Sequence, residues 1–262
     1  KIIKSYIPEK TKIFIEKIIS MKEKTVSEAV AHRRSTRVYD PEQPIDSKVV
    51  QECIKHASLA PTSSNLQLWE FYHIPSEDQK KAVAEACFNQ PAAKTALQMV
   101  VTVVRRDLWP QRVAANIEFI KAGFAKKNVV DPKTQKRALN YYQKIIPHLY
   151  KGGNPVRGFV MKLFMTLRGL SKTTYREVSA SDLRVVGHKS TALASQNFMM
   201  SMAAQGYDTC PMEGFDSKKL KQILNLPAAA EINMVISCGI RKPDGIYGER
   251  FRIPFEEVYF EL

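Results

Sequence analysis

Three arginines and two hydroxyl side chains occupy five consecutive positions, Arg33-Arg34-Ser35-Thr36-Arg37. A guanidinium can donate two parallel hydrogen bonds to a phosphate, and hydroxyl groups and loop amides can complete the shell around its oxygens. The segment is therefore a candidate phosphate-binding stretch. Taken alone it is a weak signal, because arginines on a surface turn are more often solvated than bound to a ligand.

Three further segments carry groups that could contact a flat polar ligand. One is rich in small hydroxyls and amides, one combines a proline and a glycine between two predicted helices, and one holds two more guanidiniums. They are Ala60–Trp69 (APTSSNLQLW), Cys210–Asp216 (CPMEGFD) and Gly248–Pro254 (GERFRIP). Each of them, taken singly, is also consistent with an ordinary turn or connector.

The positive charge of the chain is concentrated in one segment. The 262 residues carry 40 Lys+Arg and 26 Asp+Glu, a net charge of +14. Between Lys121 and Arg176 there are 13 basic residues and one acid, Asp131, so the remainder has 27 basic and 25 acidic residues. The segment could be a solvated helical insertion, a mouth that attracts anionic substrates, or an element that touches a membrane surface. No helix-turn-helix, zinc-finger or RNP signature accompanies the charge, so we expect no nucleic-acid partner.

Composition and cysteine spacing exclude several classes of protein. The chain is 44% apolar and 25% charged, as in globular proteins, and no apolar run approaches the roughly 18 to 20 residues of a membrane helix. Lysines and glutamates interrupt the N-terminal stretch, which predicts no signal peptide. The four cysteines form no C-x-x-C pair, and no histidine stands at zinc-ligand spacing. We therefore expect reduced cysteines, no metal site and a cytoplasmic location.

Hydrophobic periodicity and capping signals predict alternating helices and strands. The expected helices cover 9–21, 25–32 from a Thr25–Glu28 capping box, 46–60, 110–147, 189–204 and 217–224. The expected strands cover 69–74, 99–104, 232–238 and 258–262. This alternation indicates an α/β or α+β class without deciding between them.

The four segments, in this order, resemble the FMN-dependent nitroreductases. RRSTR followed by Val38-Tyr39-Asp40 resembles the opening phosphate-binding stretch of that family, and APTSSNLQLW and CPMEGFD resemble its second and third FMN segments. ERFRIP resembles its closing basic motif. The resemblance covers roughly residues 25–110 and 187–262, and four ordered motifs are far more specific than any one of them.

The resemblance implies an α+β sandwich in which helices flank a central, mostly antiparallel sheet. It also implies an interlocked homodimer, in which the C-terminal segment of one chain reaches over the other and two FMN sites lie at the interface. The resemblance does not cover residues 1–24, which we expect to form an N-terminal helical extension because of the apolar spacing in 9–21. On the basis of the resemblance, residues 25–262 form the FMN-binding domain, with a basic helical insertion at about 111–180.

The resemblance also implies cofactor-binding roles for particular residues. In one chain, arginines and a serine bind the phosphate and ribityl chain, and four residues pack on one face of the flavin with a backbone amide near Gly214 aimed at N5. Asn89 contacts the polar edge of the isoalloxazine ring, and five residues come from the partner chain. The phosphate and ribityl set is Arg33, Arg34, Ser35, Arg37, Arg250 and Arg252; the flavin-face set is Pro211, Met212, Glu213 and Gly214; the partner set is Pro61, Thr62, Ser63, Asn65 and Gln67.

The implied activity is an NAD(P)H oxidoreductase that reduces nitroaromatic, quinone or similar small-molecule acceptors by ping-pong hydride transfer. Because the flavin performs the hydride chemistry, we expect no catalytic side chain. The absence of a G-x-G-x-x-G segment agrees with a nicotinamide that needs no Rossmann domain. Two alternatives remain: another flavin chemistry on the same fold (dehalogenation, flavin fragmentation or heterocycle oxidation), or a basic protein that binds membrane surfaces.

Overall fold

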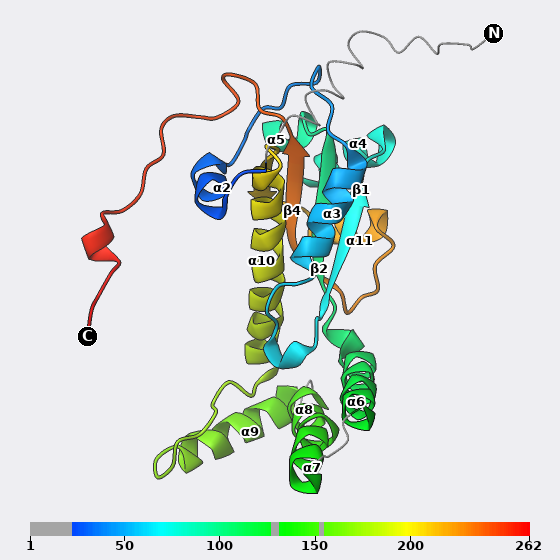
Figure 1. Ribbon diagram of the computed structural model, residues 1–262, viewed down its shortest axis with the longest axis vertical. Helices are drawn as coiled ribbons and strands as arrows, with labels where there is room; N and C mark the ends of the chain where they lie inside the picture. Colours follow the sequence, from blue (N-terminus) through cyan, green and yellow to red (C-terminus); the bar gives the residue numbers. More distant parts are fainter. Residues whose placement is uncertain (1–22, 127–130, 152–154) are drawn as a thin grey trace, which may run out of the picture.

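A four-stranded antiparallel sheet forms the centre of the chain (Figure 1). The computed structural model describes residues 23–126, 131–151 and 155–262, so the predicted helix at 9–21 lies outside the described residues. The strands are β1 (Trp69–Ile74), β2 (Gln98–Val104), β3 (Asp208–Met212) and β4 (Glu231–Gly239), in the order β1-β2-β4-β3. Every residue of β2 is buried, which fits the β-branched run that predicted this strand.

Helices cover both faces of the sheet. On one face α3 and α10 pack against Val100 and Ile236, and on the other α4, α5 and α11 pack against Val101 and Val235. The helices are α2 (Val26–His32), α3 (Ser47–Ala57), α4 (Glu77–Ala86), α5 (Pro91–Lys94), α6 (Trp109–Ala125), α7 (Pro132–Asn140), α8 (Ile146–Tyr150), α9 (Pro155–Arg168), α10 (Ala180–Ala204) and α11 (Ser217–Ile223). The predicted α+β fold, with a central antiparallel sheet flanked by helices, is confirmed.

Two helix starts follow the capping chemistry that the sequence predicts. The Thr25 backbone N–H donates to Glu28 Oε2 at 2.7 Å, and the Glu28 N–H donates back to Thr25 Oγ1 at 3.3 Å. Asp46 Oδ1 accepts from the Lys48 N–H at 2.8 Å. Each side chain satisfies N–H groups that have no partner within the first turn of a helix.

Other boundaries differ from the prediction. α10 begins at Ala180, nine residues before the expected start, because Ser179 and Asp182 form a second capping box. The region expected to be helical over 110–147 is divided into several helices. Asp131 caps a new helix that starts at Pro132, and a π-helical turn at Tyr141–Ile145 separates α7 from α8.

Two further expectations, a connector and a strand, are also wrong. The segment Cys210–Asp216, expected to connect two helices, begins inside strand β3, where Pro211 pairs with Ile236. Proline is tolerated there because β3 is an edge strand of the sheet, and its missing N–H removes no bond from the interior of the sheet. The expected strand at 258–262 is absent: a 3₁₀ turn covers Phe255–Glu257, and residues 251–262 are exposed on a tail that leaves the body (Figure 1).

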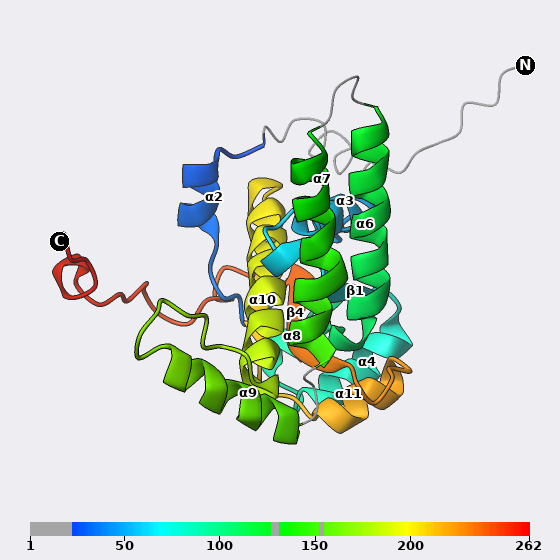
Figure 2. The ribbon, with the colours of Figure 1, turned by 90° about the horizontal axis from the view of Figure 1, so that it is seen from below.

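Helices α6 to α9 project beyond one end of the sheet (Figures 1 and 2). They rest on the loop that precedes β1: Leu66 and Leu68 form a buried cluster with Val113 of α6 and Ile146 of α8. We call α6 to α9 the helical layer. It contains the described helices of the basic segment and contacts the sheet domain through this loop.

One close packing contact makes the sheet sensitive to a single methyl group. Tyr39 is fully buried and its hydroxyl donates to the Ser237 carbonyl at 3.0 Å. Its ring lies so close to Gly239 that a Cβ there would stand 2.5 Å from Tyr39 Cδ1.

We expect Gly239→Ala to lower the free energy of unfolding by about 1–3 kcal/mol, because the new methyl group overpacks the Tyr39 ring. Gly123 in α6 is a matched control, since a Cβ there meets nothing within 4 Å. Gly123→Ala should raise the free energy of unfolding by about 0.5–1 kcal/mol through helix propensity. Urea denaturation measures both. Equal effects of the two substitutions would contradict the proposed Tyr39 contact.

Candidate functional site

Five arginines from the two ends of the chain gather at one place. Arg250 Nη2 donates to the carbonyls of Ala31 at 2.8 Å and Arg33 at 2.7 Å, and Arg34 Nη2 donates to the Gly248 carbonyl at 3.0 Å. These contacts bring the first and the last candidate segments side by side. We call Arg33, Arg34, Arg37, Arg250 and Arg252 the arginine cluster.

No acid balances this charge within the described part of the chain. Partial burial lowers the pKa of Arg33, and the neighbouring charges of Arg250 and Arg252 lower it further. None of the ion pairs among described residues involves a member of the arginine cluster. The guanidiniums of Arg34 and Arg250 are held by neutral carbonyls instead, so their charge remains available to an anion.

The arginine cluster lies beside β3. Ser35 forms a parallel bridge with Thr209, and the Thr36 N–H donates to the Thr209 carbonyl at 3.2 Å. Arg37 Nη1 stands 3.7 Å from Cys210 Sγ. Burial raises the pKa of the Cys210 thiol, and the charges of Arg37 and Arg33 only partly oppose this, so the thiol stays neutral. The first and third candidate segments are therefore in direct contact.

Beyond β3 the chain presents backbone and amide groups. Gln90 Nε2 donates to the Gly214 carbonyl at 2.8 Å and to the Cys87 carbonyl at 3.1 Å. Among the described residues no group accepts from the Gly214 N–H, and the exposed Asn89 side chain has no hydrogen-bond partner either. Gln90 thus brings the Asn89 turn next to Glu213 and Gly214.

The second candidate segment has a strained backbone. Ser64, Asn65 and Gln67 have φ values of 53°, 51° and 48°. Such left-handed conformations cost roughly 1–3 kcal/mol each for non-glycine residues and persist only when the surroundings enforce them. Here the Tyr142 hydroxyl donates to the Ser64 carbonyl at 3.0 Å, and Asn116 Nδ2 donates to the Asn65 carbonyl at 3.0 Å.

Backbone strain coincides with the candidate segments. Six non-glycine residues have positive φ in the described part of the chain. Three belong to the second segment, and two, Phe88 and Asn89, form the turn beside Gly214. This coincidence supports a functional role for both turns, because strain of this kind clusters at binding sites.

The second segment nevertheless lies far from the arginine cluster within one chain. Trp69, the last residue of the segment, pairs with Val104 at the end of the sheet opposite to Asp208 and Gly239. Moreover, β1 and β3 are the two opposite edges of the sheet. One chain therefore brings together the arginines, Ser35, Asn89 and residues 211–214, but not Pro61, Thr62, Ser63, Asn65 and Gln67.

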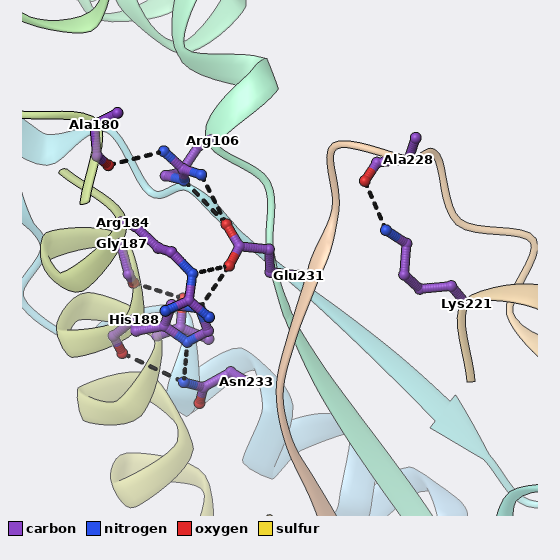
Figure 3. A network of polar contacts seen from close by, with 10 residues as sticks. Arg106, Ala180, Arg184, Gly187, His188, Lys221, Ala228, Glu231 and Asn233 are labelled. Carbon is purple, nitrogen blue, oxygen red and sulfur yellow. Dashed lines mark hydrogen bonds and ion pairs between the residues drawn. The ribbon is translucent and has the colours of Figure 1, made fainter. Parts of the chain in front are cut away.

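A polar network around Glu231 holds α10 at this second end (Figure 3). Arg106 Nη2 donates to Glu231 Oε1 at 2.8 Å, Arg184 Nε donates to Oε2, and His188 Nε2 stands 3.3 Å from Oε2. Burial alone would raise the pKa of Glu231, but these three partners hold it below its ordinary value.

The same network fixes the histidine tautomer. Asn233 Nδ2 lies 3.1 Å from His188 Nδ1 and donates to it, so the proton of a neutral imidazole sits on Nε2 and points at Glu231. Two residues further along α10, Ser190 Oγ accepts from the Ser63 N–H at 3.3 Å. The network thereby anchors the helix that holds the second segment.

A buried carboxylate anchors the first segment in a comparable way. Asp208 is 3% exposed and accepts from Arg241 Nε at 2.7 Å and the Arg241 N–H at 2.8 Å, while His32 Nε2 stands 3.3 Å away. Arg241 Nη2 also donates to the His32 carbonyl at 3.0 Å. Because His32 directly precedes Arg33, this network sets where the arginine segment leaves α2.

Several positioning residues were missed at the sequence level. Gln90, Asn116, Asp208 and Arg241 hold the candidate segments but belong to no motif. Each acts on a residue at least 33 positions away, so no local pattern marks it. Among the described residues, no three His, Cys, Asp or Glu side chains are grouped as a metal ion would require. Nor does any helix in that part combine the length and apolar character needed to cross a membrane.

We expect Asp208→Asn to lower the free energy of unfolding by about 3 kcal/mol at pH 7, because it leaves Arg241 without its buried counter-charge. Burial raises the Asp208 pKa, but hydrogen bonds from His32 and Arg241 outweigh it and hold the pKa below its ordinary value of 3.8. The stabilisation is therefore complete above the unfolded-state pKa and is lost as the pH falls below about 4. Urea titrations at pH 7 and below pH 4 should show the gap between wild type and variant narrowing. Asp244→Asn, which removes an exposed carboxylate, is the control and should change little. A gap that is independent of pH would contradict the ionised carboxylate as its cause.

Comparisons with known proteins agree with this geometry. Residues 30–240 match the model of the nitroreductase family. Protein DrgA of Synechocystis is 26% identical over 220 residues, 83% of this chain and 84% of that protein. MhqN of Bacillus subtilis, which is named as an NAD(P)H nitroreductase, is 26% identical over 230 residues, 87% of this chain and 94% of its own length.

Solved structures show the same fold. YdfN of Bacillus subtilis, described as a nitroreductase, superposes with a TM-score of 0.70 at 21% identity, covering 90% of this chain and 98% of its own. A protein of Exiguobacterium sibiricum, described as a nitroreductase in complex with FMN, gives a TM-score of 0.65 at 22% identity, with coverages of 91% and 98%. The predicted nitroreductase-like fold and oxidoreductase class are confirmed: this chain belongs to the nitroreductase family.

Proposed function

We propose that the chain is an FMN-dependent NAD(P)H oxidoreductase that reduces nitroaromatic, quinone or similar small-molecule acceptors. The observation that carries the proposal is the arginine cluster beside β3, which has no acidic partner among the described residues. The FMN held by the Exiguobacterium relative and the NAD(P)H in the name of MhqN support the choice of cofactor and reductant.

The residues at this place suit FMN. Its phosphate carries close to two negative charges, and Arg33, Arg34 and Arg37 supply guanidiniums from one side while Arg250 and Arg252 supply them from the other. In this proposal Ser35 completes the oxygen shell through its hydroxyl. The half-burial of Arg33 strengthens each contact, because the local dielectric is lower than in water.

The flavin ring would lie along the end of β3. Pro211 and Met212 offer an apolar surface, and the Gly214 N–H is free to donate to N5. Glu213 and the Asn89 amide lie at the same edge and would contact the polar rim of the ring. When bound, FMN supplies the hydride chemistry, so the chain's own groups need only bind, orient and exclude water.

A second copy of the chain would complete each site. Because Pro61, Thr62, Ser63, Asn65 and Gln67 lie at the opposite edge and end of the sheet, they can reach a flavin only if it belongs to another chain. We therefore propose a homodimer with two equivalent FMN sites. The exposed tail at 251–262 is free to extend over the other chain.

The overall reaction balances as two separate two-electron steps. NAD(P)H delivers a hydride and leaves as NAD(P)⁺ before the acceptor enters. A quinone then takes up that hydride and one proton to give a hydroquinone. A nitro group takes up a hydride and one proton and loses water to give a nitroso group, with the proton supplied by water.

An optical spectrum tests the proposal. The purified protein, reconstituted with FMN if necessary, should show flavin absorbance that bleaches on anaerobic addition of NADPH or NADH and recovers on adding a quinone or nitroarene. A protein that retains no FMN after reconstitution would refute it. NAD(P)H oxidation that no such acceptor accelerates would favour another chemistry on the same fold.

Arg33→Ala should weaken FMN binding by about 1.5–3 kcal/mol, roughly 10- to 150-fold, because it removes a charge-assisted contact to the phosphate. Quenching of flavin fluorescence on titration into FMN-free protein measures the affinity. Riboflavin, which lacks the phosphate, should bind wild type and variant equally. Arg168→Ala removes an exposed guanidinium from α9 and should leave FMN affinity unchanged. An equal loss for riboflavin and FMN would show that Arg33 does not bind the phosphate.

A further inference from the structure

An apolar cavity of about 690 Å³ lies between the helical layer and the second segment. Its walls come from the π-helical turn and α8, from the inner face of α9, and from the first turns of α10. The lining that matters here is Ser64, Tyr141, Tyr150, Met161, Met165 and Leu183. We call this space the tyrosine–methionine cavity. Its volume falls in the range of about 300–1,000 Å³ that is typical of small-molecule sites.

The walls are suited to a hydrocarbon group. Aromatic rings and aliphatic side chains dominate, and methionine side chains adapt to irregular apolar ligands. Burial raises the pKa of Tyr150 to about 12, so that hydroxyl stays neutral. Lys144 and His148 are the basic residues of the lining, and the lining contains no Asp or Glu. A largely apolar molecule, whether neutral or negatively charged, therefore meets no electrostatic repulsion from the lining.

The cavity opens onto the segment that the proposed function assigns to flavin binding. Ser64 Oγ lies 2.7 Å from the Tyr141 hydroxyl, and the Tyr142 hydroxyl donates to the Ser64 carbonyl at 3.0 Å. Ser63 also lines the cavity and is tied to α10 through Ser190. One lip of the cavity is thus the strained turn itself, and a molecule seated inside is next to Ser63 and Ser64.

We propose that the tyrosine–methionine cavity binds the hydrocarbon tail of a lipophilic electron acceptor, whose reducible head lies at Ser63–Ser64. The inference rests on the proposed function for the identity of the head group. It goes further in assigning the helical layer a role: the layer selects acceptors that carry a long apolar substituent over those with the bare ring.

Binding of the neutral fluorescent probe phenylnaphthylamine to the FMN-loaded protein tests the cavity without any turnover. Met161→Trp and Met165→Trp each fill the cavity from α9 and should weaken probe binding at least tenfold. Leu163→Trp is the matched control, because Leu163 is 53% exposed on the same helix and does not line the cavity. Its probe affinity should equal that of wild type. The proposal would be overturned if the wild type did not bind the probe. It would also be overturned if Met161→Trp and Met165→Trp both bound the probe as tightly as the wild type.

A chain-length comparison tests the role of the cavity in turnover. The KM for a benzoquinone that carries a decyl chain should be at least tenfold lower than the KM for the same benzoquinone in which a methyl group replaces the decyl chain. Met161→Trp should bring that ratio toward one while the rate of flavin bleaching by NADPH stays unchanged. Equal KM values in the wild type would overturn the proposal.

The two hypotheses fail in different ways. A protein without flavin bleaching would refute the proposed function, while the probe titration would still decide whether the cavity takes an apolar ligand. Normal bleaching with no tail preference would refute the cavity assignment and leave the proposed function standing.

Discussion

Like-charged groups repel, and the arrangement of this chain depends on how it keeps five guanidiniums together. Arg250 is held by the carbonyls of Ala31 and Arg33, and Arg34 is held by the Gly248 carbonyl. Carbonyl dipoles orient a guanidinium without neutralising it, whereas a carboxylate would do both. The buried carboxylate of Asp208 is paired with Arg241, which also binds the His32 carbonyl at the end of α2. Asp208 therefore does not neutralise the charge of the arginine cluster. A dianion is the simplest partner for such a set.

The topology of the sheet separates the candidate segments. Three strand spacings of about 4.8 Å place β1 roughly 14 Å from β3, and the two candidate ends also point in opposite directions along the strands. Along α10, Ser190 and Ala204 are 14 residues apart, or about 21 Å. Ser190 holds the second segment, and Ala204 accepts from the Lys24 N–H just before α2. The distance between the two segments is thus set by one rigid helix, which supports the proposed site shared between two chains.

The sequence predicted what local chemistry decides. The Thr25–Glu28 capping box, the Asp46 cap and the buried runs of β2 and β4 depend on neighbouring residues, and they are present as expected. β3 was missed because Pro211 argues against a strand, and only its position at a sheet edge permits it. Val258, Tyr259 and Phe260 favour a strand in the tail, but pairing requires an edge that the tail does not reach. The arginine motifs were visible in the sequence, whereas Gln90, Asn116 and Arg241 act across long separations that no local pattern records.

Cavities are even less visible in a sequence, because they arise where packed elements fail to fill space. α9 carries apolar residues around most of its circumference, so its pattern alone cannot say which side faces inward. Gly158 is buried and Met161 and Met165 line the cavity, while Phe159, Leu163 and Phe164 face outward. Two flexible methionines on the inner side leave room that branched residues would fill more rigidly. Lys144 and His148, both from the basic segment 121–176, line this cavity beside its apolar walls, so this segment supplies both apolar surface and cations there. Those two properties together favour acceptors that are both apolar and neutral or anionic, and they connect the helical layer to the chemistry expected at Ser63–Ser64.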